Sequence, residues 1–175
     1  SFLPDNEVIS AIEDIGDKFA TEYPVDTLVY SKNDDILTSD AFVEILEIEI
    51  ALIENELIAN NSLTPSNPST DIVAIPNYLA PFVEGDASDL QQLKAIYANK
   101  TDQEIKDAFN SAKQNPLLAG VVINILGEYD GDNSAKATKI TFKFDNSQRE
   151  GEGTGEAFDR MVSVELEMAA VVNGM

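Results

Sequence analysis

The stretch of residues 39–60 constrains the fold more than any other part of the sequence. Its apolar residues fall into two sets, one on each side of a helix, with glutamates between them. The first set has the 3-4-3-4 spacing of a heptad seam: Val43, Leu46, Ile50, Ile53 and Leu57. The second set comprises Ile45, Ile48 and Leu52. A helix that is apolar on two sides is either central to its own core or shared with a neighbouring subunit.

A strand is the alternative for part of this stretch, because residues 46–50 alternate apolar and acidic side chains. The length of the whole stretch and its content of Glu, Ala and Leu favour a helix. We therefore predict a helix over 39–60. We expect its heptad seam to contact another subunit of a homo-oligomer.

Three further helices are predicted. Residues 6–22 carry apolar side chains at helical spacing and are followed by Pro24. Residues 90–98 and 102–113 form a pair, and Thr101 with Glu104 gives the second of them a capping box. Residues 61–87, between the helices predicted over 39–60 and 90–98, hold four of the seven prolines and are rich in Ser and Asn. This composition predicts an extended loop.

The C-terminal third favours strands, at 121–126, 138–144 and 162–168. In the second of these, Ile140, Phe142 and Phe144 share one face. If the second and third strands are neighbours in a hairpin, two lysines can pair with two glutamates across it. The residues concerned are Lys139 and Lys143 with Glu165 and Glu167.

The connection between those two strands, residues 146–160, is longer than a hairpin turn. It contains Gly151, Gly153 and Gly155, and long loops in small domains are usually functional or mobile. We expect these glycines to contact a neighbouring subunit. The whole chain, residues 1–175, is then a single α+β domain in which N-terminal and central helices pack on a small C-terminal antiparallel sheet with a long Gly-rich hairpin loop.

The composition excludes several chemistries. The chain contains no Cys and no His, so thiol nucleophiles, Ser–His pairs and His-ligated zinc are all ruled out. We therefore expect no enzymatic activity. The formal net charge of −21 repels phosphates and anionic lipids, which predicts no direct binding to nucleic acid or to a membrane. No apolar run is long enough for a transmembrane helix.

One segment resembles a calcium loop. Asp130, Asp132 and Ser134 place oxygen ligands at positions 1, 3 and 5, but Ala135 and Thr141 stand where an EF-hand needs Gly and Glu. The alternative is an ordinary Asp/Gly/Asn turn between strands. Calcium bound by these three residues is thus a hypothesis alongside the turn, and no other cofactor is expected.

A helix-plus-antiparallel-sheet organisation with a long Gly-rich loop resembles, in shape, the tail, neck or tube components of tailed phages and phage-like particles. That resemblance implies a structural subunit of a symmetric assembly, located in a virion or in host cytoplasm, whose acidic lining lets DNA slide without sticking. Two alternatives remain open. One is an acidic DNA mimic that blocks DNA-binding proteins, and the other is a secreted binding module assisted by calcium.

Overall fold

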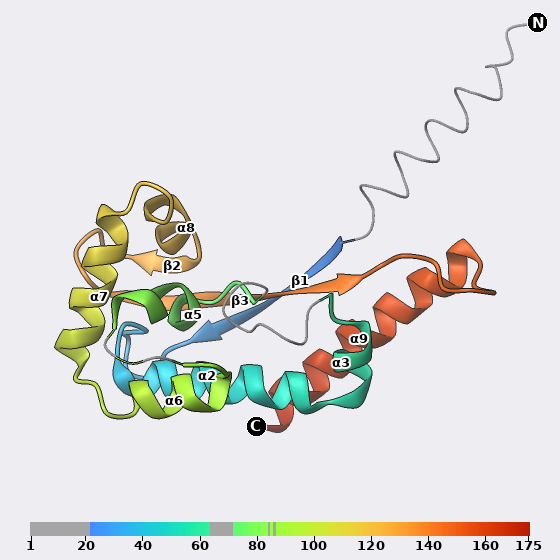
Figure 1. Ribbon diagram of the computed structural model, residues 1–175, viewed down its shortest axis with the longest axis horizontal. Helices are drawn as coiled ribbons and strands as arrows, with labels where there is room; N and C mark the ends of the chain where they lie inside the picture. Colours follow the sequence, from blue (N-terminus) through green and yellow to red (C-terminus); the bar gives the residue numbers. More distant parts are fainter. Residues whose placement is uncertain (1–21, 64–71, 84, 86) are drawn as a thin grey trace, which may run out of the picture.

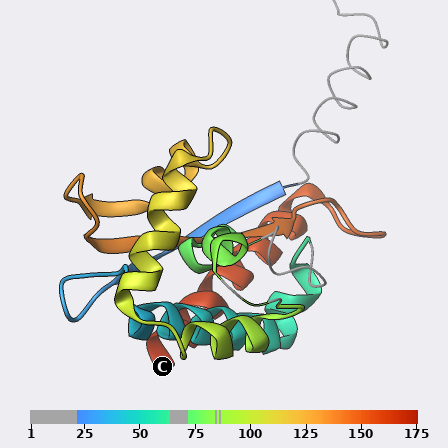
Figure 2. The same ribbon diagram turned by 60° about the vertical axis from the view of Figure 1, so that its left-hand side comes forward.

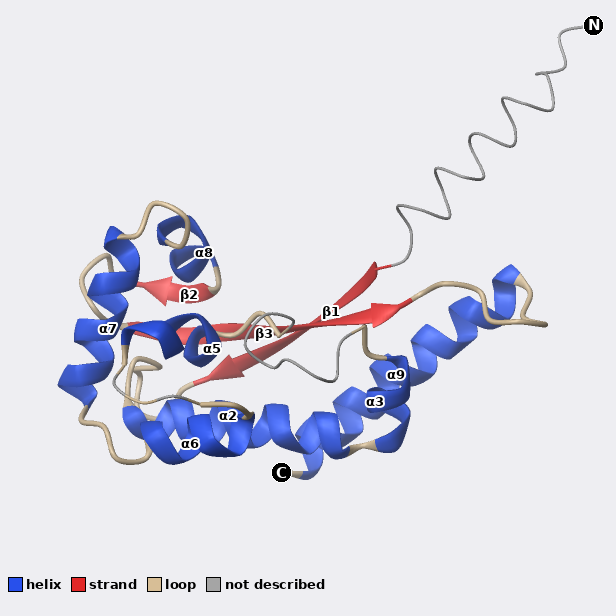
Figure 3. Ribbon diagram, viewed as in Figure 1, coloured by secondary structure: helices blue, strands red, loops and turns tan. Residues whose placement is uncertain are grey.

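The computed structural model describes residues 22–63, 72–83, 85 and 87–175. The predicted helix over 6–22 lies outside the described residues, except for Glu22, which begins a strand. Within the described part, seven α-helices accompany a three-stranded antiparallel sheet (Figures 1 and 3). The predicted α+β class is confirmed.

The sheet has the order β1-β3-β2 and comprises β1 (Glu22–Tyr30), β2 (Leu126–Tyr129) and β3 (Ala135–Asp145). The strand predicted over 138–144 is confirmed as the centre of β3. Its three predicted inward side chains are buried: Ile140, Phe142 and Phe144. β1 pairs antiparallel with β3 along its whole length, with Glu22 opposite Asp145 and Tyr30 opposite Ala137.

Helices cover the apolar face of the sheet. In Figure 1, α2 (Ser39–Glu54), α3 (Glu56–Asn61) and α6 (Leu90–Tyr97) lie below it, and α9 (Thr154–Gly174) descends from the right-hand end of the sheet to below it. Figure 2 again shows α2 and α6 under the strands. The helix predicted over 39–60 is confirmed, but it breaks at Asn55, whose backbone is extended (φ −75°, ψ 122°). The Asn55 side chain accepts from the Leu57 and Ile58 N–H groups and so starts α3 afresh.

The extended loop predicted over 61–87 is wrong for its second half. Residues 75–82 form α5 (Ile75–Leu79) and a 3₁₀ turn (Ala80–Phe82). The prolines 76 and 81 lie in the first turns of these helices, where a missing N–H costs nothing. The next predicted pair is confirmed as α6 and α7 (Asp102–Gln114), and the capping box of Thr101 and Glu104 is present.

Two predicted strands are wrong. Residues 162–168 belong to α9, because Ala157, Met161, Val164 and Met168 also recur at helical spacing and all four are buried. Residues 121–126 mostly form α8 (Ala119–Asn124), and only Leu126 begins a strand. Periodicity alone cannot separate the two structures in short apolar runs of this kind, so packing against neighbouring elements decides.

The hairpin loop predicted over 146–160 is therefore a strand-to-helix connection. It ends at Gly153, where the Glu156 carboxylate accepts the Gly153 N–H at 2.7 Å and begins α9. The predicted partners of the β3 lysines are likewise wrong. Lys139 and Lys143 pair instead with Asp26 and Glu22 of β1, at 3.3 and 3.1 Å.

Candidate functional site

Glu49, on α2, is a fully buried titratable group. Its side chain is fully enclosed, and Asn77 donates to its Oε2 atom at 3.0 Å. Burial raises the pKa of Glu49 to about 8, and the Asn77 hydrogen bond only partly offsets this. The neighbouring Tyr97 is also enclosed and donates to the Pro76 carbonyl at 2.7 Å.

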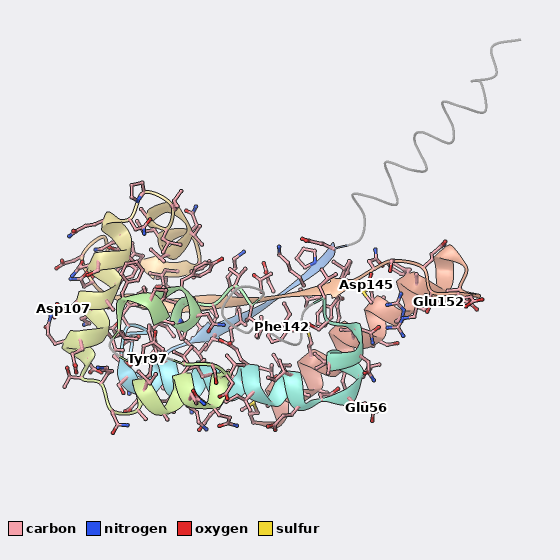
Figure 4. All side chains as sticks on the ribbon, viewed as in Figure 1. Glu56, Tyr97, Asp107, Phe142, Asp145 and Glu152 are labelled. Atoms are coloured by element: carbon pink, nitrogen blue, oxygen red, sulfur yellow. The ribbon has the colours of Figure 1, made fainter. Side chains whose placement is uncertain are left out.

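Figure 4 shows Tyr97 between α6 and the elements above it, inside the molecule. Its ring packs edge-on against Phe42 at 5.0 Å between centroids. Burial and the nearby Glu49 both raise the pKa of Tyr97. With neither group open to solvent, this cluster is a neutral polar element of the core and offers no surface to a substrate.

The three predicted calcium ligands lie in a tight turn after β2. The Asp130 Oδ1 atom accepts from the N–H groups of Asp132 and Ser134, at 2.8 and 3.1 Å, and these bonds lower the pKa of Asp130. The Lys113 ammonium donates to the Asp132 carbonyl at 3.1 Å and so supplies a positive charge beside the turn. This geometry favours the Asp-Gly turn. Within the residues that the structure describes, no group of three or more acidic side chains could hold a metal ion.

The predicted interface on α2 lies mostly inside the chain. Leu46 and Ile50 are buried, and Val43 and Ile53 pack half-buried against the same core. Leu57 follows the break at Asn55 and is exposed. The second stripe of this helix is also covered, since α2 contacts α5, α6 and α9. Both apolar sides of α2 thus serve this chain's own core.

The three predicted interface glycines lie at the start of α9, and all are exposed. Gly151 has a φ of +88° and is the one whose backbone requires glycine. The segment around them is firmly held. The Arg160 guanidinium donates to the carbonyls of Asp145 and Ser147 and to the Glu152 carboxylate, at 2.7 to 3.1 Å.

The sequence interpretation missed an apolar stripe on α9. Phe158 and Leu166 are exposed by 62% and 67%, Ala169 is exposed, and Val162 is half-buried between them. These residues recur every three or four positions and form a second stripe beside the buried one. The helical spacing of these residues was present in the sequence, but it was not recognised because 162–168 was predicted as a strand.

This stripe lies next to the outer strand of the sheet. The Tyr23 hydroxyl of β1 donates to the Glu165 carboxylate of α9, which turns that side of the helix toward β1. Phe158, Val162 and Ala169 are seven, three and four residues from Glu165 and therefore share its side. On β1 itself, Leu28 and Tyr30 are exposed by 64% and 65%.

We refer to β1 together with Phe158, Val162 and Ala169 as the β1–α9 corner. Leu166 lies about 100° round the helix from Glu165, at the outer margin of this surface. It joins an edge strand to an exposed apolar helix stripe, and such surfaces on soluble proteins are typical of contacts with other polypeptides. Among the helices of the described residues, none is long and apolar enough to cross a membrane. The chain matches no known protein family, no curated protein and no solved structure.

Proposed function

We propose that this chain is a non-catalytic assembly subunit that binds a protein partner through the β1–α9 corner. The observation that carries the proposal is the exposed apolar stripe on α9 next to the edge strand β1, because contiguous exposed apolar surface typically marks a contact with another polypeptide. The proposal keeps the function class expected from the sequence and names a different surface.

Two features support binding over catalysis. The buried Glu49 cluster has no access to solvent, and the Asp130 turn uses its carboxylate on its own backbone. Besides these two features, a surface hollow of about 460 Å³ is lined by Asn55, Glu56, Leu57, Asn60 and Glu167. It offers two carboxylates and two amides without a nucleophile beside a base.

The proposal also sets the character of the partner. A surface that carries −21 charges is repelled by another acidic surface, so a neutral or basic partner is favoured. The proposed contact combines apolar burial on α9 with polar contacts along β1. A subunit of a symmetric particle is one setting in which such a contact would operate.

Site-specific photocrosslinking tests this proposal. A photoreactive phenylalanine analogue replaces Leu166 in one variant and Ser111, an exposed residue on the polar side of α7, in the control. Both proteins are irradiated alone and in an extract of the source cells. We expect one adduct of defined mass from position 166, identified by mass spectrometry, and none from position 111.

A second variant makes the result specific. Phe158→Ser, combined with the analogue at 166, should reduce the adduct severalfold, since the same stripe holds the partner. Equal labelling at positions 166 and 111, or labelling that ignores Phe158→Ser, would contradict the proposal.

A further inference from the structure

The outer edge of β1 presents alternate backbone groups. The Ser31 N–H donates to the Lys136 carbonyl at 2.9 Å, and this fixes the phase of the pairing between β1 and β3. Odd-numbered residues of β1 direct their N–H and C=O groups toward β3, so even-numbered residues direct theirs away from it. The even positions are Glu22, Pro24, Asp26, Leu28 and Tyr30. Pro24 lacks an N–H, so the donors on this edge are concentrated between Asp26 and Tyr30.

The side chains beneath this edge form an apolar floor. Near Tyr23 the floor is the exposed stripe of α9, which the Glu165 contact places beside β1. Near Tyr30 lies a hollow of about 120 Å³ between the end of β1 and the start of α2. Its lining is mixed, with Val29, Ile36 and Ala41 beside polar residues that include Ser31 and Thr38. A strand added at this edge would therefore have one side over helices and the other in solvent.

We propose that the β1–α9 corner binds an extended polypeptide segment from outside residues 1–175, which adds to the sheet as a strand antiparallel to β1. This inference rests on the proposed function and specifies its partner. Every second side chain of the segment is apolar and packs on α9, as the two-residue period of a strand requires. The remaining side chains are polar and lie on the solvent side, where Glu22 and Asp26 already pair with Lys143 and Lys139.

A second copy of this chain fits the edge poorly. A symmetric pairing of two β1 strands centred on Asp26 sets two carboxylates directly opposite each other, and like charges in that position destabilise a sheet. It also brings together two chains of net charge −21. A basic or neutral segment avoids both costs.

The connectivity supports the same position for the added strand. If the helices between α2 and β2 (α3 and α5 to α8, with the 3₁₀ turn) are left aside, β1, α2, β2, β3 and α9 give strand, helix, strand, strand, helix, with the sheet order β1-β3-β2. These are five of the six elements of the split βαβ arrangement, whose remaining strand lies beside the first and antiparallel to it. Among the described residues, no strand occupies that position beside β1.

A synthetic peptide tests the proposal on the full chain. The probe is a nine-residue peptide that alternates valine with lysine or threonine, and its control has the same composition with the valines contiguous. We expect the alternating peptide to bind and the control to bind at least about tenfold more weakly, because contiguous valines place half of them away from α9.

Amide hydrogen exchange locates the bound peptide within β1. Exchange should slow at Asp26, Leu28 and Tyr30, whose N–H groups point outward. Val25, Thr27 and Val29 are the internal control, since their N–H groups already face β3 and should change little. Binding without slower exchange at the even positions would overturn strand addition.

Two variants keep the result interpretable. Leu28→Pro removes an outward N–H without removing a bond to β3, and it should weaken peptide binding about tenfold. Phe158→Ser leaves the edge intact and removes part of the apolar floor, with a similar expected loss. If both variants bind the peptide like the native chain, the proposal is wrong.

The remaining outcomes identify other occupants. Even-position amides that exchange slowly before peptide is added, at every protein concentration, would show that the chain covers its own edge. Protection that rises with protein concentration would identify a second copy. Either result overturns this inference and leaves the proposed function standing, whereas failure of the crosslink at position 166 would remove that function as well.

Discussion

α2 and α9 carry the same kind of sequence pattern, but they differ in whether their second apolar stripe is covered by the rest of the chain. Each has two apolar stripes separated by acidic residues. In α2 both stripes are buried or half-buried in the core, and the helix contacts α3, α5, α6 and α9. In α9 one stripe packs into the core, and the other leaves Phe158 and Leu166 in solvent. The period of a helix indicates that it has an apolar side, but neighbours decide whether that side is covered.

The stripes of α2 and α9 also differ in what they contribute to. A stripe such as that of α2 stabilises the isolated chain, so its loss is measured by unfolding. A stripe such as that of α9 contributes little until a partner covers it, so its loss is measured by binding. Equal substitutions on the two helices test whether the α2 stripe stabilises the fold and the α9 stripe does not.

The largest expected effect comes from matched leucine truncations. Leu46→Ala on α2 should lower the free energy of unfolding by about 2–5 kcal/mol, because Leu46 is fully buried and its removal leaves a cavity. Leu166→Ala on α9 should change it by no more than about 0.5 kcal/mol, because that side chain is largely exposed. Urea unfolding of both variants measures the difference, and similar losses would show that the two stripes are equivalent.

The second expected effect concerns the carboxyl group on α2. Because the pKa of Glu49 is about 8 in the folded chain and about 4.5 when exposed, the unfolded state loses this proton at lower pH than the folded state. Stability is therefore fully present below about pH 4.5 and declines as pH rises toward 8. Glu49→Gln should remove a pH dependence on the order of 2–4 kcal/mol across this window.

Unfolding of native and Glu49→Gln proteins at several pH values tests this effect. Glu44→Gln, which removes an exposed carboxylate from the same helix, is the control for net charge. As the pH rises, the native protein should lose stability relative to Glu49→Gln. The stability of the native protein relative to Glu44→Gln should not fall in this way. A constant gap for Glu49→Gln would show that this carboxyl titrates alike in both states.

The smallest expected effect tests whether α9 is firmly seated. Arg160 in its first turns bonds the carbonyls after β3, the Glu152 carboxylate and the Asn61 amide oxygen, at 2.7 to 3.1 Å. Arg160→Ala should lower the free energy of unfolding by about 1–2 kcal/mol, since several buried acceptors lose a charged donor.

Limited trypsin digestion reports the same change locally. In the native chain Arg160 lies within α9 with a mostly buried side chain, so cleavage there should be slow. In Arg160→Ala, cleavage after Arg149 should accelerate as the connection before α9 loosens. Unchanged cleavage and unchanged stability would mean that α9 is held by its buried stripe alone.

Much of the fold could be predicted from the sequence where local signals agreed. The capping box of Thr101 and Glu104 marked the start of α7, and the alternation of Ile140, Phe142 and Phe144 marked β3 and its buried face. The helix over 39–60 was also predicted, although the short cap at Asn55 that divides it was not. In each case backbone hydrogen bonding and side-chain burial favour the same structure.

The candidate site could not be predicted in the same way. Residues 162–168 satisfy both a strand and a helix period, and the choice depends on Met161, Val164 and Met168 packing into the core as α9 contacts α2 and α3. The edge position of β1 depends on strand pairing between segments more than a hundred residues apart. Neither fact is contained in a local window of sequence.

The sequence by itself determined the α+β class, the acidic surface, the absence of thiol and imidazole chemistry, and the positions of the strongly periodic helices and of β3. Only the tertiary structure decided which apolar stripe is covered and which strand has an open edge. The physical reason is that hydrophobic burial is non-directional: it drives every apolar stripe toward some partner. Which partner is available follows from how distant segments pair and pack.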